Sequence, residues 1–199
     1  MSIANYPDLV AAVGNYLARD DLASRVPEFI SLFEAKANRE LRCRQMETRT
    51  TLNANIASPE PAFIALPSDF QTMRSVCVIT ATDKPRLEFL DDDRIKDYRS
   101  NIGDLTALPR YFGLDNSNLE LVPRPDANYG VEVVYRKNIP ALTSGAPTNW
   151  LMTLAPDAYL YGVLLEAAPY MKDDPRIEVW SAGLKMAVDG LNKLTLEAA

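Results

Sequence analysis

The hydrophobic residues of this chain change their spacing twice, and that change limits the folds open to it. Toward both ends they recur every three or four positions, which is the spacing of an amphipathic helix. In the middle they alternate with polar residues in short runs that turn residues separate, which is typical of β-strands. Helices at both ends with strands between them predict an α+β fold and not a series of alternating βαβ units.

The first 45 residues are expected to form two helices. Asn5 is placed to cap the first helix, and Asp8 resembles the reciprocal half of a capping box. The second helix is expected to begin near Pro27, a residue that a first helical turn tolerates, and to end near Gln45. Each has one apolar stripe, formed by Tyr6, Leu9, Val10, Val13 and Leu17 in the first and by Phe29, Ile30, Phe33, Ala37 and Leu41 in the second.

The middle of the chain is expected to be rich in strands, with one helix among them. The cluster from Asn116 to Asn118 separates two apolar runs and indicates a hairpin. A helical spacing of apolar residues predicts a helix between Asp91 and Ile102. The expected strands are Met46–Ala54, Phe63–Leu66, Met73–Ile79, Leu87–Phe89, Arg110–Leu114, Leu119–Val122 and Val131–Tyr135.

The last quarter is expected to be helical after a polar loop over residues 138–149. Residues 158–171 are almost wholly apolar, and a helix that is apolar all round must be covered all round. Asp174 is placed to cap the final helix, with Pro175 at its first position. The apolar stripe of that helix contains Ile177, Trp180, Leu184, Ala187 and Leu191.

This order predicts two domains within 199 residues, a length that allows one domain with a smaller one inserted. Residues 1–45 and 138–199 are expected to form one mainly α-helical bundle. Residues 46–137 are expected to form a β-rich insertion with a short helix.

The sequence has no histidine, which removes the commonest general base and the commonest zinc ligand. Ser75 and Cys77 therefore have no histidine to activate them, and no glycine elbow surrounds either. Asp91 to Asp93 are interpreted as negative charge at a helix start, because successive carboxylates point in different directions. We therefore expect no catalytic residue, no cofactor and no metal site.

The net charge of −6 gives little gain from counterion release, so we expect DNA to pass without tight or specific binding. Cys43 and Cys77 are too few for a disulfide framework and are expected to be reduced. No apolar run is long enough for a membrane helix, and the first residues lack the pattern of a signal peptide. The protein is expected to stay in the cytoplasm where it is made, with no membrane partner.

Several short segments resemble a known family through their order and spacing. The longest runs from Pro147 to Asp174 (PTNWLMTLAPDAYLYGVLLEAAPYMKDD) and is followed by Trp180. The others are YPDLV from Tyr6, RDD from Arg19, PEFI from Pro27, RELR from Arg39, LPSDF from Leu66, PRYF from Pro109 and LVPRP from Leu121. Together they cover nearly the whole chain, which in this respect resembles the head–tail adaptor (connector) proteins of tailed bacteriophages.

The resemblance implies a structural virion protein, made in the bacterial cytoplasm and located in the neck of the particle. Adaptor subunits form a ring of about twelve copies on the portal protein. The ring extends the channel for genomic DNA and presents a platform for the tail or for nozzle and closure proteins. The family contributes no catalytic residues, and its C-termini dock against the portal.

Three features are expected to contact the portal or a neighbouring subunit. The tyrosines of the all-round apolar helix combine apolar rings with polar tips, although that helix equally fits the centre of the subunit's own core. A basic cluster fits acidic partner groups, but it also suits a helix C-terminus in solvent, or DNA. The leucines of the tail either anchor the portal contact or finish the last helix against its own subunit. The residues concerned are Arg39, Arg42, Tyr159, Tyr161, Leu191, Leu194 and Leu196.

Two other functions stay open on the sequence. A head-closure or tail-completion protein does the same mechanical work one ring further along the neck. A virion-associated glycoside hydrolase that degrades the cell wall needs only two carboxylates, so the absence of histidine does not exclude it.

Overall fold

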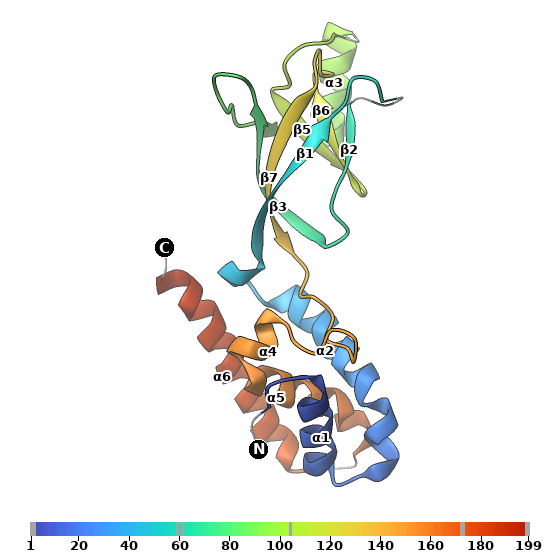
Figure 1. Cartoon of the computed structure of the whole chain (residues 1–199), viewed down its shortest axis with the longest axis vertical. Coiled ribbons are helices and arrows are strands. Elements are labelled where there is room, and N and C mark those ends of the chain that lie inside the picture. Colours follow the sequence, from blue (N-terminus) through green and yellow to red (C-terminus); the bar gives the residue numbers. More distant parts are fainter. Residues whose placement is uncertain (1–2, 59, 61, 104, 172–173, 198–199) are drawn as a thin grey trace. The chain divides into compact units, whose positions relative to one another are not determined.

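The chain divides into two compact units, Met1–Met46 with Asn138–Ala199, and Glu47–Lys137 (Figure 1). This computed structural model describes residues 3–58, 60, 62–103, 105–171 and 174–197, with the backbone alone for residues 20 and 194–197. One unit is helical and the other contains two β-sheets, which confirms the predicted α+β class.

The helical unit is arranged around one helix, α5 (Pro156–Ala167). It packs against the four other helices of the unit, which are α1 (Tyr6–Leu17), α2 (Val26–Glu40), α4 (Trp150–Leu154) and α6 (Arg176–Glu197). Short 3-10 turns lie at Asp20–Arg25, Arg44–Met46 and Ala168–Tyr170. Because α5 is apolar on every side, it takes the position that its neighbours shield from water.

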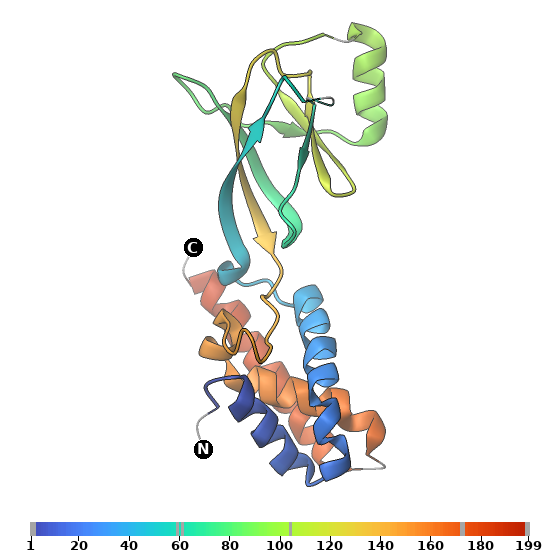
Figure 2. The same cartoon turned by 45° about the vertical axis from the view of Figure 1, so that its right-hand side comes forward.

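Two glycines set how closely the flanking helices approach α5. At Gly162 of α5, the ring of Phe33 from α2 occupies the space that a β-carbon would need. At Gly183 of α6, the ring of Tyr161 from α5 does the same. The helices α2 and α6 therefore lie on different sides of α5, as both views show (Figures 1 and 2).

The end of α2 differs from the sequence prediction. The helix ends at Glu40 and not near Gln45, because Leu41 has extended backbone angles (φ −70°, ψ 140°). The extended stretch buries the side chains of Leu41 and Cys43 and exposes that of Arg42 between them. Alternation at a period of two places both apolar groups in the core, whereas a helix would have turned Cys43 away from Leu41.

The start of α1 differs in one contact. Asn5 caps the helix as predicted, since its side chain accepts a hydrogen bond from the Asp8 N–H at 3.0 Å. The Asp8 carboxylate accepts from the N–H of Ala4 at 3.2 Å, not from that of Asn5. The reciprocal half of the capping box is therefore shifted by one residue.

The second unit has a three-stranded sheet and a four-stranded sheet. The first has the order β1 (Glu47–Ala54), β7 (Tyr129–Lys137), β3 (Phe70–Ile79), and all its pairs are antiparallel. The second has the order β2 (Phe63–Ala65), β6 (Asn118–Val122), β5 (Tyr111–Asp115), β4 (Glu88–Phe89). The apolar residues of both sheets form one core, and β5 and β6 make the hairpin predicted at Asn116.

Helix α3 (Asp92–Ile102) packs on the four-stranded sheet. Its Ile95 side chain lies over Gly113, where a β-carbon would overlap it. Arg99 forms an ion pair with Glu120, a carboxylate that is only 5% exposed. The Asp91 side chain accepts a hydrogen bond from the N–H of Arg94 and caps the helix, in agreement with the interpretation of these aspartates as a helix start.

Candidate functional site

The residues predicted to contact partners fall at different depths in the helical unit. Tyr159 is fully buried and Leu191 is nearly so, whereas Tyr161 is half-buried against α6. Arg39 and Arg42 are exposed. The side chains of Leu194 and Leu196 lie outside the described residues.

The hydroxyl of Tyr159 is the centre of a buried polar network. It donates to Glu34 Oε1 at 2.8 Å and accepts from Asn149 Nδ2 at 2.6 Å. Burial raises the pKa of the Glu34 carboxyl, and the hydrogen bond from Tyr159 partly offsets that rise. Burial and the adjacent Glu34 carboxylate raise the pKa of Tyr159. Tyr159 is therefore a core residue that satisfies polar groups, as buried polar groups generally require.

The same network fastens the loop of residues 138–149 to the helices. Glu34 Oε1 also accepts from the N–H of Leu142 at 2.8 Å, and Asn38 Oδ1 accepts from the N–H of Ile139 at 2.7 Å. Asn149 Nδ2 donates to the carbonyl of Pro140 at 2.7 Å. Side chains of α2 thus fix the backbone of a segment roughly a hundred residues away, and a loop held at several points has little conformational freedom left to lose on binding.

The exposed part of the candidate site is a basic patch beside the end of α6. The N–H of Arg42 donates to Asn192 Oδ1 at 3.1 Å, and its guanidinium donates to the carbonyl of Leu41 at 2.8 Å. The structure thus brings the segment after α2 to the end of α6, where Leu191 is buried. We call the exposed cations Arg39, Arg42, Arg44 and Lys193 the basic patch. Such a patch favours contacts with acidic protein groups through charge-assisted hydrogen bonds.

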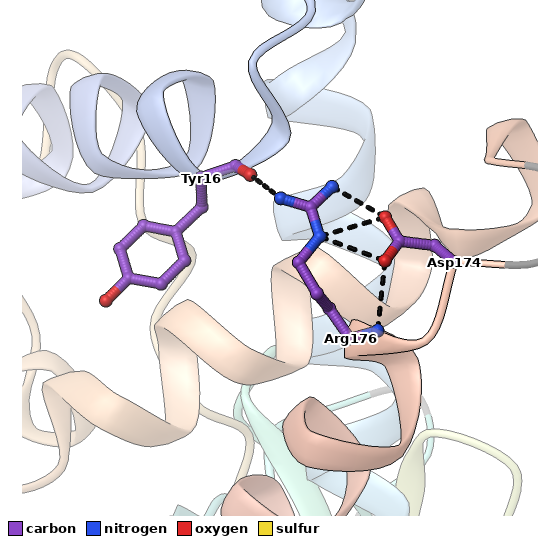
Figure 3. Close-up of polar contacts among 3 residues, drawn as sticks. All are labelled: Tyr16, Asp174 and Arg176. Atoms are coloured by element: carbon purple, nitrogen blue, oxygen red, sulfur yellow. Dashed lines mark hydrogen bonds and ion pairs between the residues drawn. The ribbon is translucent and has the colours of Figure 1, made fainter.

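A guanidinium joins the start of α6 to the end of α1 (Figure 3). Arg176 donates to both carboxylate oxygens of Asp174, with a shortest contact of 2.6 Å, and to the carbonyl of Tyr16 at 2.7 Å. That carbonyl is one of the last four of α1, which have no partner inside the helix. Arg176 therefore acts as a C-terminal cap for α1 that is supplied by another helix.

Replacing Arg176 with glutamine is expected to lower the thermal unfolding temperature slightly, because it removes this cap and the contact of the guanidinium with the Trp180 ring, whose centroid is 5.2 Å away. Arg19→Gln is the matched control, since Arg19 forms an equally short ion pair with Asp21, also two residues away, but no hydrogen bond to a helix carbonyl. Both arginine side chains are about half exposed, so water screens each ion pair and limits its contribution. Calorimetry that gives the same small change for both variants would contradict the capping role.

Two functional groups of this network were missed in the sequence. Glu34 lies four residues after Ile30 and three before Ala37, at helical spacing with both. The spacing therefore predicts a carboxylate on the buried face of α2. Asn149 precedes Trp150 as an N-cap, and its Oδ1 accepts from the N–H of Met152 at 2.9 Å. No pattern in the sequence indicated that Glu34 and Asn149 meet at Tyr159, because they come from segments that are far apart.

In the described parts of the chain, no three histidine, cysteine, aspartate or glutamate side chains converge in a way that would hold a metal ion. Among the described helices, none has both the length and the apolar character needed to cross a membrane. Neither Cys43 nor Cys77 forms a disulfide within the described residues, and Cys43 is buried.

Comparison with known proteins gives one family. Residues 4–198 match the family model described as SU10 adaptor protein. None of the curated proteins compared with the chain matches it.

Proposed function

Since the chain belongs to the SU10 adaptor protein family, whose members are structural phage adaptors, we propose that it is the head–tail adaptor of a phage virion. About twelve copies form a ring beneath the portal, extend the DNA channel and provide the platform on which tail or nozzle and closure proteins assemble. The family match carries this proposal, because it spans both the helical unit and the β-rich unit. The two units act as separate domains of each subunit.

A structural role without catalysis fits the groups that the chain offers. The two buried carboxylates of the described residues, Glu34 and Glu120, lie in different units, and each is held by a donor of its own unit. No observation therefore favours the hydrolase alternative. The net charge of −6 fits a surface past which DNA moves without binding.

The residues after Leu191 and the adjacent Arg42 of the basic patch form the portal contact in this proposal. Leu194 and Leu196 supply apolar anchors, and Arg42 and Lys193 supply charges at the rim. Tyr159 and Leu191 support this surface from inside the subunit, since both are buried.

Truncation after Asn192 tests this contact. It keeps buried Leu191 and the Arg42–Asn192 hydrogen bond, so we expect a folded protein. Its affinity for the purified cognate portal is expected to fall at least about tenfold, because anchors at the centre of an interface carry most of the binding energy. Light scattering with and without portal measures the loss, and circular dichroism checks the fold.

The matched control is truncation after Glu197, which removes only two alanines and is expected to bind as the full chain does. If the shorter protein still binds the portal, the tail is not the anchor. If it loses its helical signal, the tail belongs to the core of the subunit. A full-length protein that does not bind the portal contradicts the adaptor function itself.

A further inference from the structure

Two helices of the helical unit carry apolar side chains on faces that no described element covers. On α2, Leu32 is 54% exposed and Ala35, one turn further on, is exposed too. On α6, Val179 is 66% exposed, Met186 is 76% exposed and Ala182 lies between them on the same face. We call these the α2 stripe and the α6 stripe. On each helix the buried side chains lie on a different face, with Phe33 on α2 and with Trp180 and Leu184 on α6.

The two stripes also carry opposite charges that have no partner within the described chain. Arg39 continues the α2 stripe, and Asp189 continues the α6 stripe. Both side chains are exposed, and among the described residues neither has an oppositely charged group within ion-pair distance. Arg39 lies seven positions after Leu32, and Asp189 lies seven positions after Ala182. Seven residues make about two turns, so each pair lies on one side of its helix at the same spacing.

The directions of the helices decide how two copies can meet. The helices α2 and α6 run in the same general direction within the unit (Figures 1 and 2). In a ring of about twelve copies, neighbours differ by a rotation of about 30°, which changes the direction of a helix by no more than that angle. The α2 of one copy and the α6 of the next are therefore close to parallel when they meet.

We propose that the α2 stripe of each subunit packs against the α6 stripe of its neighbour in the ring. Leu32 lies against Ala182, between Val179 and Met186, and Arg39 pairs with Asp189. This is a head-to-tail contact, which requires two different and complementary surfaces on one chain and closes when the rotation does. The inference rests on the proposed ring function and names the surfaces that build the ring.

A charge swap tests the pairing. Arg39→Asp and Asp189→Arg, each alone, place like charges opposite one another, and each is expected to weaken assembly on the purified cognate portal about tenfold. The double variant restores an opposite pair and is expected to recover the wild-type level. Arg86→Asp is the matched control, because it makes the same charge change at an exposed arginine of the other unit. Native mass spectrometry counts the adaptor copies on each portal.

The outcomes separate this inference from the function on which it rests. If wild-type protein assembles on the portal but the double variant is no better than the single ones, the pairing is wrong while the adaptor function stands. If Arg39→Asp loses assembly while Asp189→Arg keeps the wild-type level, Arg39 belongs to the portal contact and the pairing is overturned. A wild-type protein that does not assemble on the portal overturns both.

Cysteine cross-linking gives a second readout that does not depend on charge. Leu32→Cys and Ala182→Cys in one chain are expected to yield, on mild oxidation of the assembled ring, a ladder of covalent multimers. Each single variant keeps the natural Cys43 and Cys77 and is expected to give no ladder. Dimers from Ala182→Cys alone would indicate a two-fold contact between identical faces and would contradict the head-to-tail arrangement.

Discussion

Replacing Gly162 with leucine is expected to unfold the helical unit, and Gly162→Ala is expected to destabilise it by about 1–3 kcal/mol. A β-carbon at this position would lie inside the ring of Phe33, which is itself buried between α2 and α5. Alanine gains about 1 kcal/mol of helix propensity over glycine, but the overlap costs more because neither helix is free to withdraw. Leucine adds a whole side chain to the same closed space.

Gly14→Ala in α1 is the matched control. It is also a helical glycine, and a β-carbon built there meets no described heavy atom within 4 Å. It is expected to raise the free energy of unfolding by up to about 1 kcal/mol through helix propensity alone. Urea unfolding followed by circular dichroism at a helical wavelength measures both variants. Equal stability of Gly162→Ala and the wild type would show that α2 and α5 do not approach closely at this glycine.

The position of α5 illustrates what the sequence predicts well. A run without a polar side leaves no face for solvent, so the requirement that it be covered all round was predictable before any contact was known. Which helices cover it was not predictable. That depends on Gly162 and Gly183, which are ordinary glycines in the sequence and become contact points only when Phe33 and Tyr161 reach them.

The end of α2 illustrates where spacing misleads. Leu41 continues the apolar stripe of the helix, and so a helix of five more residues was predicted. Residues 41–43 also fit alternation, and the burial of both Leu41 and Cys43 decides for the extended form. A short segment that satisfies both periods is resolved by tertiary packing and not by local pattern.

The candidate site, too, was predictable from the sequence only in part. The basic residues Arg39 and Arg42 were found from composition, and their exposure is what a charged cluster predicts. The choice between core and interface for Tyr159 could not be made from the sequence, because an apolar ring with a polar tip suits both environments. Its burial depends on Glu34, which supplies an acceptor at a point where water cannot.

Tyr159→Phe is expected to destabilise the helical unit by about 1–3 kcal/mol, because it leaves Glu34 and Asn149 without a shared partner in the core. Tyr161→Phe on the same helix is the matched control, since its hydroxyl makes no hydrogen bond with the described residues and its ring keeps the contact with Gly183. That variant is expected to have the stability of the wild type.

The loss in Tyr159→Phe is expected to depend on pH through Glu34. Burial raises the pKa of Glu34 above its value in the unfolded chain. A carboxyl of this kind contributes stability that is fully present below the unfolded pKa and is lost as the pH rises through the folded pKa. Above the folded pKa the carboxylate is charged, and the hydrogen bond from Tyr159 then stabilises a buried charge. The variant should therefore lose more stability at pH 8 than at pH 5.

Glu34→Gln isolates the titrating group. Glutamine keeps an oxygen that accepts from both Tyr159 and the N–H of Leu142, but it has no charge to bury. Relative to the wild type, this variant is expected to gain stability as the pH rises from 5 to 8, and in its background the cost of Tyr159→Phe should become the same at both pH values. Urea unfolding of the four proteins at each pH measures the coupling. A cost of Tyr159→Phe that depends on pH equally with and without Glu34 would assign the pH dependence to another group.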